Sequence, residues 1–420
     1  MNPPKRIIIL GAGFAGLKLA QKLNNTPYDV LLINRQNYHQ FQPLLYQVAT
    51  ARLEPTSISF PLRKVFQHSK NVRIRIAEIL NINIQEKYVA TSVGNYSYDY
   101  LVVAYGCTTN YFGNKKIEEF ALPMKSVSES LQLRNHILQT FEDALVASPS
   151  ELESLYNFVI VGGGPTGVEL AGALVEMKEH VLPKDYPEKD FAKLTIYLVE
   201  GSPNTLNAMS DFAKKASEKY LRDMNIIVVK NTYVIDFDGR KATLNNGETL
   251  PTQNLIWTAG VTGNTIEGFP KEVMTKGNRL LVNQFHEVQN LSDVFAIGDI
   301  ALMPTKEYPI GHPQLAGVAN AQAVNLAKNF KQIHKNKKKI IYEYRDRGAM
   351  ATIGKRKAII DLPKLKFKGR FAWFFWMFLH LMLILSIKNR LIIFLNWMMS
   401  YFYNDSTLRV ILYPKIKRDY

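Results

Sequence analysis

One pattern occurs twice in the chain, and this repeat restricts the fold more than any other feature of the sequence. In both copies a short run of apolar residues enters a glycine-rich turn and continues into a stretch with apolar residues at helical spacing. The first copy is RIIILGAGFAGLKLA, residues 6–20, and the second is NFVIVGGGPTGVELAG, residues 157–172. A strand, a G-x-G-x-x-G turn and a helix in this order predict a dinucleotide-binding unit.

The spacing of the glycines has a physical reason in each turn. The first glycine permits a tight turn, the second lets a diphosphate approach the backbone, and the third lets helix and strand pack closely. The diphosphate then lies at the helix N-terminus, where free N–H groups and the helix dipole favour an anion. The residues expected to contact it are Gly11, Ala12, Gly13, Phe14, Ala15 and Gly16 in the first copy, and Gly162, Gly164, Thr166 and Gly167 in the second.

The second strand of such a unit usually ends in an acidic residue that binds the ribose hydroxyls. In the second copy the strand LTIYLVE ends at Glu200, which favours NADH over NADPH because a carboxylate would repel a 2′-phosphate. In the first copy the strand DVLLIN ends at Asn34, which can still hydrogen-bond a ribose, and Arg35 beside it can contact a phosphate. The alternative is that Asn34 and Arg35 are ordinary polar residues at a strand end.

Two dinucleotide units in one chain indicate that two nucleotides bind together. The usual chemical reason is that one is a bound flavin and the other a nicotinamide that reduces it. Hydride transfer then needs two rings held at close distance and no protein nucleophile. The 8 histidines show no metal-ligand spacing, and the single cysteine, Cys107, excludes a disulfide framework and fits a reduced, cytosolic setting.

The net charge of +16 is concentrated towards the C-terminus. Residues 331–370 hold 14 Lys and Arg against 3 Asp and Glu, an excess of 14 − 3 = 11. Such a basic block indicates an anionic partner, either nucleic acid or an anionic membrane face. No nucleic-acid motif accompanies the block, so the sequence favours lipid over nucleic acid.

Apolar, aromatic-rich segments follow the basic block. Residues 371–387 form a run of about 17 mostly apolar residues, interrupted by His380 and Ser386, whereas a membrane span needs roughly 20. Lys388 and Arg390 separate this run from a second one. Flanking cations and aromatic residues predict helices that lie in the membrane interface. The alternative is a buried or dimer-forming pair of helices.

Seven stretches of the chain resemble the type II NADH dehydrogenases, single-subunit NADH:quinone oxidoreductases that hold FAD and lie on the membrane surface. They are LGAGFAGL, NRQNYHQFQPLLYQVATA, LVVAYGCTTNYFG, VGGGPTGVELAGAL, IWTAGV, FAIGDIA and FAWFFWMFLHLMLILSIKNRLIIFLNW. The glycine motifs occur in many flavoproteins, but YHQFQPLLYQVATA together with the C-terminal aromatic segment is much more specific. The resemblance covers nearly the whole chain.

The resemblance implies an α/β fold of the two-dinucleotide-binding-domain flavoprotein type, with a C-terminal membrane-associating helical region. The FAD domain is then discontinuous, residues 1–150 and 266–335, and the NADH domain, residues 151–265, is inserted between its parts. Residues 336–420 form the basic and amphipathic membrane anchor. On this prediction the first glycine turn holds FAD and the second holds NADH.

The resemblance also implies site residues outside the two turns. VFAIGDIA matches the second FAD signature, in which Gly298 permits close approach and Asp299 binds the ribityl chain. The alternative for Asp299 is a helix N-cap. Further backbone contacts are implied for Ala316 and Gly317 with FAD, and for Ala259 and Gly260 with NADH.

Glu169 is the residue that the resemblance implies for chemistry. It occupies the Gly-Val-Glu position of the family on the first turn of the NADH-domain helix, where it positions nicotinamide and quinone and assists protonation. The alternative is a structural carboxylate favoured by the helix dipole. Because that dipole lowers the pKa of a carboxyl group, we expect Glu169 to be ionised.

One stretch departs from the family pattern. The family has Ala-Gln-x-Ala-x-Gln after the second FAD signature, and its first glutamine lies by the flavin and the quinone. Here the matching positions, 316–321, read AGVANA, so both glutamines are missing. If the stretch is helical, Gln314 lies one turn before Gly317 and shares its face. Gln314 is therefore the candidate quinone contact.

The function implied is that of a monotopic flavoenzyme on the cytoplasmic face of the membrane. NADH reduces FAD, and a quinone, menaquinone or ubiquinone, accepts two electrons without proton pumping. Whether the chain forms a homodimer is left open. Two alternatives remain: a reductase of the same fold with another acceptor, and a membrane-bound flavoprotein redox sensor with weak turnover. Sulfide:quinone chemistry needs a cysteine pair, which one cysteine excludes.

Overall fold

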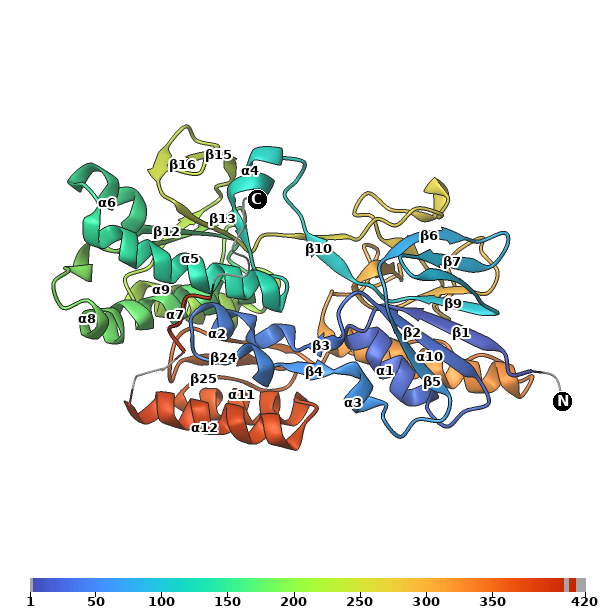
Figure 1. Cartoon of the computed structure of the whole chain (residues 1–420). Helices are drawn as coiled ribbons and strands as arrows, with labels where there is room; N and C mark the ends of the chain where they lie inside the picture. Colours follow the sequence, from blue (N-terminus) through green and yellow to red (C-terminus); the bar gives the residue numbers. More distant parts are fainter. Residues whose placement is uncertain (1–2, 404–407, 413–420) are drawn as a thin grey trace, which may run out of the picture. The chain divides into compact units, whose positions relative to one another are not determined.

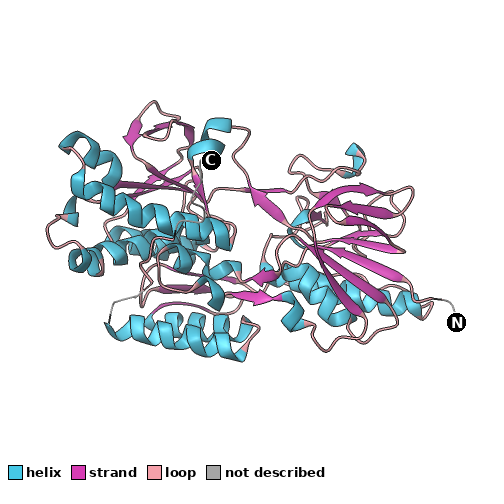
Figure 2. Cartoon of the chain, viewed as in Figure 1, coloured by secondary structure: helices cyan, strands magenta, loops and turns pink. Residues whose placement is uncertain are grey.

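The chain forms two compact units, each built around a five-stranded parallel sheet (Figures 1 and 2). The computed structural model describes residues 3–403 and 408–412. The first unit comprises residues 1–40, 60–108 and 261–346, and the second comprises residues 41–59, 109–260 and 347–420. Helices cover both sheets, so the predicted α/β fold with two Rossmann-like halves is confirmed.

The sheet of the first unit has the strand order β21-β9-β1-β2-β5. Its strands are β1 (Arg6–Leu10), β2 (Asp29–Asn34), β5 (Val72–Ile76), β9 (Tyr100–Val103) and β21 (Val294–Ala296). Residues 7–10 are fully buried, as expected for a central parallel strand that is covered on both faces.

Different elements cover the two faces of this sheet. Helices α1 (Phe14–Leu23) and α10 (Ala316–His334) pack against each other, and their apolar residues join Ile7 and Ile9 in one core. On the other face Ile8 and Leu10 share a core with the antiparallel sheet β6 (Ile79–Asn83), β7 (Tyr88–Thr91) and β8 (Gly94–Ser97). The alternating contacts follow from the two-residue side-chain period of a strand.

The sheet of the second unit has the order β11-β18-β12-β13-β14. Its strands are β11 (Leu122–Pro123), β12 (Asn157–Val161), β13 (Thr195–Glu200), β14 (Ile227–Lys230) and β18 (Asn254–Trp257). The helices around it are α5 (Val127–Val146), α6 (Pro149–Tyr156), α7 (Pro165–His180) and α9 (Asp211–Asp223). An antiparallel sheet, β15 (Val234–Phe237), β16 (Lys241–Leu244) and β17 (Thr249–Pro251), packs on Val159 and Val161.

The C-terminal segment belongs to the second unit. Its strands β23 (Ala349–Thr352), β24 (Ala358–Asp361) and β25 (Lys366–Gly369) form an antiparallel sheet. Strand β23 packs on α7, and β24 packs on α9 and α11 (Arg370–Leu383). Helix α12 (Ile387–Tyr403) follows and contacts α11, as Figure 1 shows.

The apolar run of residues 371–387 is divided between these two helices. Helix α11 ends at Leu383, Ile384 has an extended backbone, and α12 begins at Ile387. Ser386 marks the division: its carbonyl accepts a hydrogen bond from the backbone N–H of Arg390. In the described part of the chain, no helix combines the length and the apolar character that crossing a membrane requires.

The compact units divide the chain differently from the predicted nucleotide domains. Residues 41–59, 109–150 and 347–420 group with the second sheet, because α5 packs on β11, α6 and the short helix α2 (Leu45–Ala49). These packing contacts separate residues 109–150 from the first sheet, although they precede the second glycine turn. The assignment of FAD to residues 1–150 and 266–335, and of NADH to residues 151–265, stays a prediction.

Candidate functional site

The two glycine turns have the same backbone geometry. The first glycine of each turn is in the left-handed region, with φ of +99° at Gly11 and +108° at Gly162. A Cβ atom added to Gly11 would lie 2.6 Å from the carbonyl oxygen of Ala104, and one added to Gly162 would lie 2.9 Å from the backbone nitrogen of Ala259. Both positions therefore require glycine.

The other two glycines of each turn differ in their surroundings. A Cβ on Gly16 or Gly167, the third glycine of each turn, would overlap the carbonyl oxygen of the first. Among the described residues, a Cβ on Gly13 or Gly164 would meet no atom within 4 Å. Gly13 and Gly164 are the N-caps of α1 and α7, and no side chain in the described part of the chain caps either helix. Open space beside uncapped N–H groups fits a dinucleotide diphosphate at both turns.

The two strand-end residues brace these turns in the same way. Asn34 Oδ1 accepts a hydrogen bond from the Ala12 N–H at 2.8 Å, and Glu200 Oε2 accepts one from the Gly163 N–H at 2.5 Å. Both side chains are partly exposed, and Arg35 is exposed. Asn34 is thus more than an ordinary polar residue at a strand end, since it holds the turn. Ribose contact by Asn34, Arg35 or Glu200 stays a prediction.

The second FAD signature lies against the first turn. Gly298 has φ +76°, and a Cβ there would approach the Cβ of Ala15 at 3.0 Å. The alternative that Asp299 caps a helix is wrong, because Asp299 lies inside the 3₁₀ turn Gly298–Ile300 and Ile297 is its N-cap. The Gly298 N–H donates to Gln322 Oε1 at 2.7 Å. Sequence reasoning missed Gln322, although an amide in the second turn of α10 was a usable signal.

Gln314 does not lie on a helical face with Gly317, and that premise of the sequence analysis is wrong. Helix α10 begins at Ala316, and Leu315 is its N-cap. Gln314 lies before the helix, where its amide Nε2 donates to the Asp299 carbonyl and to Cys107 Sγ, each at 3.1 Å. A Cβ on Gly317 would meet nothing within 4 Å. The quinone role of Gln314 stays a prediction.

Glu169 lies in the second turn of α7, because that helix begins at Pro165. The predicted place on the first turn is therefore wrong. The side chain is buried, and Oε1 accepts hydrogen bonds from the Thr352 N–H at 3.2 Å and the Thr352 hydroxyl at 3.5 Å. Burial raises the pKa of Glu169 to about 8, and the two Thr352 bonds only reduce this rise. The expectation that Glu169 is ionised is wrong, because burial outweighs the lowering expected from the helix dipole.

A small cavity adjoins Glu169 within the second unit. It has a volume of about 30 Å³, and its lining includes Tyr46, Gln47, Glu169, Thr352, Lys355 and Trp397. That space holds roughly two waters. A quinone ring is larger than this cavity, which has room for water only.

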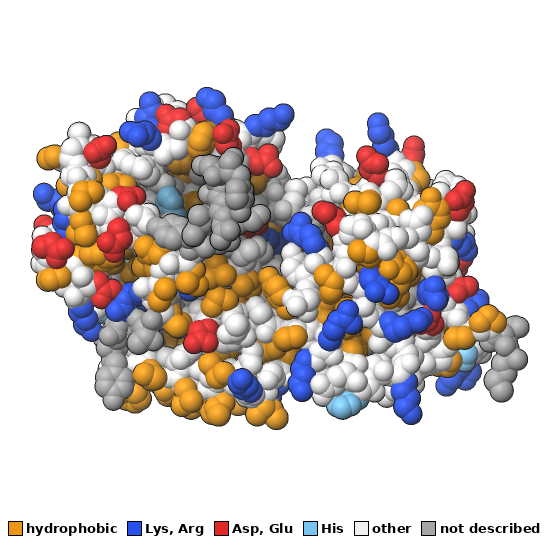
Figure 3. All heavy atoms as spheres, viewed as in Figure 1, with side chains coloured by type: hydrophobic (Ala, Val, Ile, Leu, Met, Phe, Trp, Pro, Cys, Tyr) orange, Lys and Arg blue, Asp and Glu red, His pale blue; other side chains and the backbone are white. Residues whose placement is uncertain are grey.

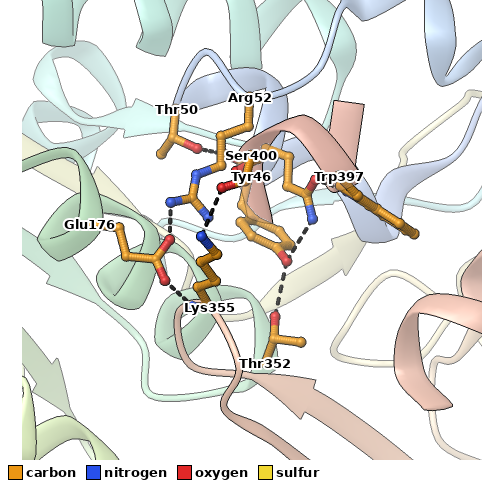
Figure 4. Close-up of polar contacts among 9 residues, drawn as sticks. Tyr46, Thr50, Arg52, Glu176, Thr352, Lys355, Trp397 and Ser400 are labelled. Atoms are coloured by element: carbon orange, nitrogen blue, oxygen red, sulfur yellow. Dashed lines mark hydrogen bonds and ion pairs between the residues drawn. The ribbon is translucent and has the colours of Figure 1, made fainter. Parts of the chain in front are cut away.

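Arg52 and Lys355 line the cavity, and both contact Glu176 beside it (Figure 4). The Arg52 guanidinium pairs with Glu176 on α7, and the other oxygen of Glu176 accepts a hydrogen bond from the Lys355 backbone N–H. The Lys355 amine donates to the Ser400 carbonyl on α12 at 2.8 Å. Burial, with Arg356 and Arg52 nearby, lowers the pKa of Lys355 to about 8.

Sequence reasoning missed these charged residues. A carboxylate inside the apolar helix segment GVELAGALVEM was a signal for Glu176. No local pattern paired Glu176 with Arg52 or Lys355. Ala259 does lie beside the second turn, since Gly162 packs on it, and Gly260 follows it in sequence. The predicted contact of both residues with NADH stays a prediction.

The chain is similar to known proteins over most of its length. Residues 5–323 match the family model of pyridine nucleotide-disulphide oxidoreductases, and residues 347–404 match that of the NDH2 C-terminal domain. The type II NADH:quinone oxidoreductases Ndh and NdhA of Mycobacterium tuberculosis are 30% and 32% identical to the chain. These alignments cover 95% and 94% of this chain and 89% and 87% of those proteins.

Solved structures share the fold. NDH2 from Plasmodium falciparum, in complex with NADH, superimposes with a TM-score of 0.90 at 23% identity, over 97% of this chain and 100% of that chain. The sulfide:quinone oxidoreductase of Aquifex aeolicus gives a TM-score of 0.73 at 19% identity, over 95% of each chain. At these identities the likeness concerns the fold alone.

Proposed function

Because the chain belongs to the type II NADH:quinone oxidoreductases, we propose that it reduces a membrane quinone with electrons from NADH, using bound FAD and pumping no protons. The observation that carries this proposal is the pair of glycine turns with matching geometry, each with open space at an uncapped helix N-terminus. When bound, FAD supplies the chemistry that accepts a hydride and returns two electrons.

The first turn holds FAD in this proposal. The N–H groups of Gly13, Phe14 and Ala15 at the start of α1 bind the diphosphate, and Asn34 keeps the turn in place. Asp299 binds the ribityl chain, and Arg35 is available to a phosphate. At the start of α10, Ala316 and Gly317 offer further backbone N–H groups beside open space. Gln314 is the candidate quinone contact.

The second turn admits NADH. Gly164 and Thr166 lie at the uncapped start of α7, and Ala259 and Gly260 follow strand β18 beside it. Glu200 braces the turn through Gly163 and leaves a partly exposed carboxylate for the ribose hydroxyls. A negative charge at this place favours NADH, because the 2′-phosphate of NADPH would be repelled.

Glu169 supports the quinone half of the reaction. Reduction of a quinone to a quinol takes two electrons and two protons. The hydride from NADH accounts for both electrons and one proton, so one further proton is needed. A carboxyl group with a pKa of about 8 is largely protonated at neutral pH and can supply it. No hydrogen bond from a described residue reaches the second oxygen of Glu169, and the cavity beside it has room for water. Glu169 therefore releases a proton and recovers it through this water.

Helices α11 and α12 are the proposed contact with an anionic lipid surface, on the cytoplasmic face. On α11 the exposed apolar residues are Phe371, Phe374, Phe378 and Met382, and on α12 they are Leu391, Leu395, Met399 and Phe402. Their spacing of three or four residues gives each helix one apolar face. Figure 3 shows apolar side chains gathered along the edge where α12 lies. Exposed Lys364 and Arg370 precede or begin α11 and attract lipid phosphates.

A homodimer formed through the same apolar faces is the competing arrangement. Flotation with vesicles of anionic lipid, alongside the molar mass of the detergent-free protein, separates the two. Flotation of a monomer supports the membrane contact. A dimer that does not float contradicts it.

An anaerobic flavin titration tests the reaction. NADH is added to the purified, FAD-loaded protein while the flavin absorbance is followed, and a menaquinone analogue is then added. We expect bleaching by NADH and recovery by the quinone. Bleaching without recovery would retain the NADH site and contradict the quinone assignment, with Gly317 as the meaningful departure from the family pattern.

A further inference from the structure

A continuous chain of hydrogen bonds joins the C-terminal helix α12 to Glu169 within the second unit. Trp397 Nε1 donates to Gln47 Oε1 at 2.7 Å, and Gln47 Nε2 donates to the Tyr46 hydroxyl at 2.9 Å. The Tyr46 hydroxyl lies 3.0 Å from Thr352 Oγ1, which in turn lies 3.5 Å from Glu169 Oε1. Figure 4 shows the part of this chain from Trp397 to Thr352.

The direction of every bond in this chain follows from its Trp397 end. An indole N–H only donates, so the oxygen of the Gln47 amide must face it and the NH₂ group must face Tyr46. The Tyr46 hydroxyl accepts that bond and therefore gives its own hydrogen to Thr352. The Thr352 hydroxyl is left to donate to the Glu169 carboxylate.

Burial makes this direction costly to change. Trp397, Gln47, Tyr46 and Thr352 are each at most 6% exposed. A buried donor or acceptor that loses its partner costs its full desolvation free energy, so one reversed bond would leave unmatched groups along the chain. The bond from the Thr352 hydroxyl to Glu169 Oε1, at 3.5 Å, is the weakest, and it depends most on the orientation of the hydroxyl hydrogen.

We propose that Trp397 is a positioning residue for Glu169, and that by setting the direction of this chain it couples the seating of α12 to the proton affinity of the carboxyl group. The proposal rests on the proposed function, in which Glu169 supplies a proton to quinone. The chain of hydrogen bonds does not conduct protons to Glu169. An indole N–H end neither accepts nor releases a proton, so protons reach Glu169 from the cavity and not along the chain.

The position of Trp397 on α12 supports the coupling. The indole ring packs on Trp376 of α11, with ring centroids 5.3 Å apart, whereas Leu391, Leu395 and Met399 of α12 are exposed. One face of the helix thus carries the proposed lipid contact and another carries the start of the chain. A shift of α12 against its neighbours therefore acts first on the Trp397–Gln47 bond.

Other charged and titratable groups surround the cavity and bear on any pH profile. They are Tyr46 and Arg52 from the segment that includes α2, Glu176 on α7, Lys355 and Arg356 between β23 and β24, His380 on α11 and Tyr401 on α12. The variants chosen to test the proposal change none of these groups. Their contribution to the profile is therefore common to all the proteins compared.

The test compares Trp397→Phe and Thr352→Val in the FAD-loaded full chain. Each variant removes the aimed hydroxyl donor from Glu169, whereas the Thr352 N–H bond remains. Because the Thr352 hydroxyl lowers the pKa of Glu169, its loss raises that pKa. We expect the alkaline limb of kcat/KM for a menaquinone analogue to move up by about 0.5–1 pH unit in each variant. The double variant shifts no further than either single variant, since both break one chain.

Trp376→Phe is the matched control. Its indole N–H is buried without a hydrogen-bond partner among the described residues, so the same ring change breaks no such bond. Its alkaline limb stays at the wild-type pH. Difference infrared spectra measure the pKa of Glu169 without turnover. The carboxyl band of Glu169 is the one that is absent in Glu169→Gln, and its pH titration reports the shift in pKa.

Two failures are distinguishable. If wild-type protein bleached by NADH is not reoxidised by quinone, the proposed function fails. The positioning role of Trp397 is tested in wild-type protein that turns over. It is overturned if Thr352→Val shifts both the alkaline limb of kcat/KM and the infrared band, whereas folded Trp397→Phe shifts neither. Additive shifts in the double variant also overturn it, because they show that the two residues act independently.

Discussion

At Glu169 two effects oppose each other on one carboxyl group. The helix dipole and the two Thr352 donors favour the carboxylate, whereas burial favours the neutral acid. Burial dominates because the charge is removed from water and no cation among the described residues pairs directly with it. The nearby Lys355 amine has a lowered pKa for the same reason, so the two groups titrate in one pH range, each near 8.

The raised pKa of Glu169 predicts a pH-dependent stability. Between the unfolded pKa of about 4.5 and the folded pKa of about 8, the folded state binds more protons than the unfolded state. The free energy of unfolding therefore falls as the pH rises through this window. Glu169→Gln removes this titrating group. We therefore expect the free energy of unfolding of the variant, relative to that of the wild type, to increase by a few kcal/mol from pH 5 to pH 9.

Thermal denaturation of FAD-loaded wild type and Glu169→Gln at the two pH values measures this gain. The Tm difference between the proteins grows with pH if the carboxyl group is buried as described. A difference that is the same at both pH values contradicts the raised pKa.

The Arg52–Glu176 pair predicts a strong asymmetry between single and double variants. Arg52→Met leaves a buried carboxylate without its cation and costs about 2–3 kcal/mol of unfolding free energy. This lies just below the range for a fully buried pair, because 25% of the Arg52 side chain is exposed. Arg52→Met with Glu176→Gln recovers most of the loss, since glutamine still accepts from the Lys355 N–H.

Urea unfolding of the two single variants and the double variant measures this coupling. A loss in the double variant equal to the sum of the two single losses would show that the pair does not interact. The cofactor content is measured first, so that all proteins are compared in the FAD-loaded state.

At the scale of elements, one strand–turn–helix unit serves two purposes through the same backbone. Strand β1 with α1 and strand β12 with α7 place equivalent glycines at equivalent φ angles, and Asn34 or Glu200 braces the turn. The difference lies in the bracing side chain, an amide at one turn and a carboxylate at the other. In the proposed function, the charge at the strand end distinguishes the nucleotides while the turn geometry stays constant.

Matched alanine substitutions in the two turns separate the nucleotide sites. Gly13→Ala and Gly164→Ala add a Cβ where no atom lies within 4 Å, so both variants fold. The added methyl group enters the space for the diphosphate. We expect Gly13→Ala to retain FAD roughly tenfold more weakly, and Gly164→Ala to keep FAD but raise the KM for NADH by a similar factor.

Flavin absorbance after gel filtration and steady-state kinetics give the two measurements. Gly16→Ala is the contrasting variant, because its Cβ would overlap the Gly11 carbonyl, and it should assemble poorly. If Gly164→Ala instead loses FAD and Gly13→Ala changes only the KM for NADH, the assignment of the turns is reversed.

At the scale of the whole molecule, the C-terminal tail is the basic block of residues 331–370 together with helices α11 and α12. Its charge and its apolar faces predict how the protein distributes between water and lipid. Phe378 on α11 and Leu395 on α12 are both exposed. Replacing both by serine removes apolar area from the proposed contact, and we expect binding to anionic vesicles to fall by roughly tenfold or more. Raised ionic strength weakens wild-type binding as well, because the basic block is screened.

Vesicle co-sedimentation across a salt series measures both effects. Val146→Ser on α5, where the valine is 88% exposed, is the control outside the tail and leaves binding unchanged. Equal losses in the control and the tail variant would show that binding is not localised on α11 and α12.

The sequence predicted the elements better than it predicted the surroundings of side chains. The strands that end at Asn34 and Glu200 and the helices that follow both glycine turns lie where the local patterns placed them. The helical setting of Gln314 was wrong by two residues, because α10 begins at Ala316. The ionisation expected of Glu169 was wrong because a local rule, the helix dipole, was outweighed by burial.

By itself the sequence determined the two dinucleotide units, because glycine spacing, apolar strands and helix starts act between neighbouring residues. Only the tertiary structure decided what surrounds Glu169. Tyr46 meets Thr352 across 306 positions of the chain, and Gln47 meets Trp397 across 350. Burial, hydrogen-bond direction and the Arg52–Glu176 pair arise from such distant contacts, and these contacts set the proton affinity of Glu169, the proposed proton donor to quinone.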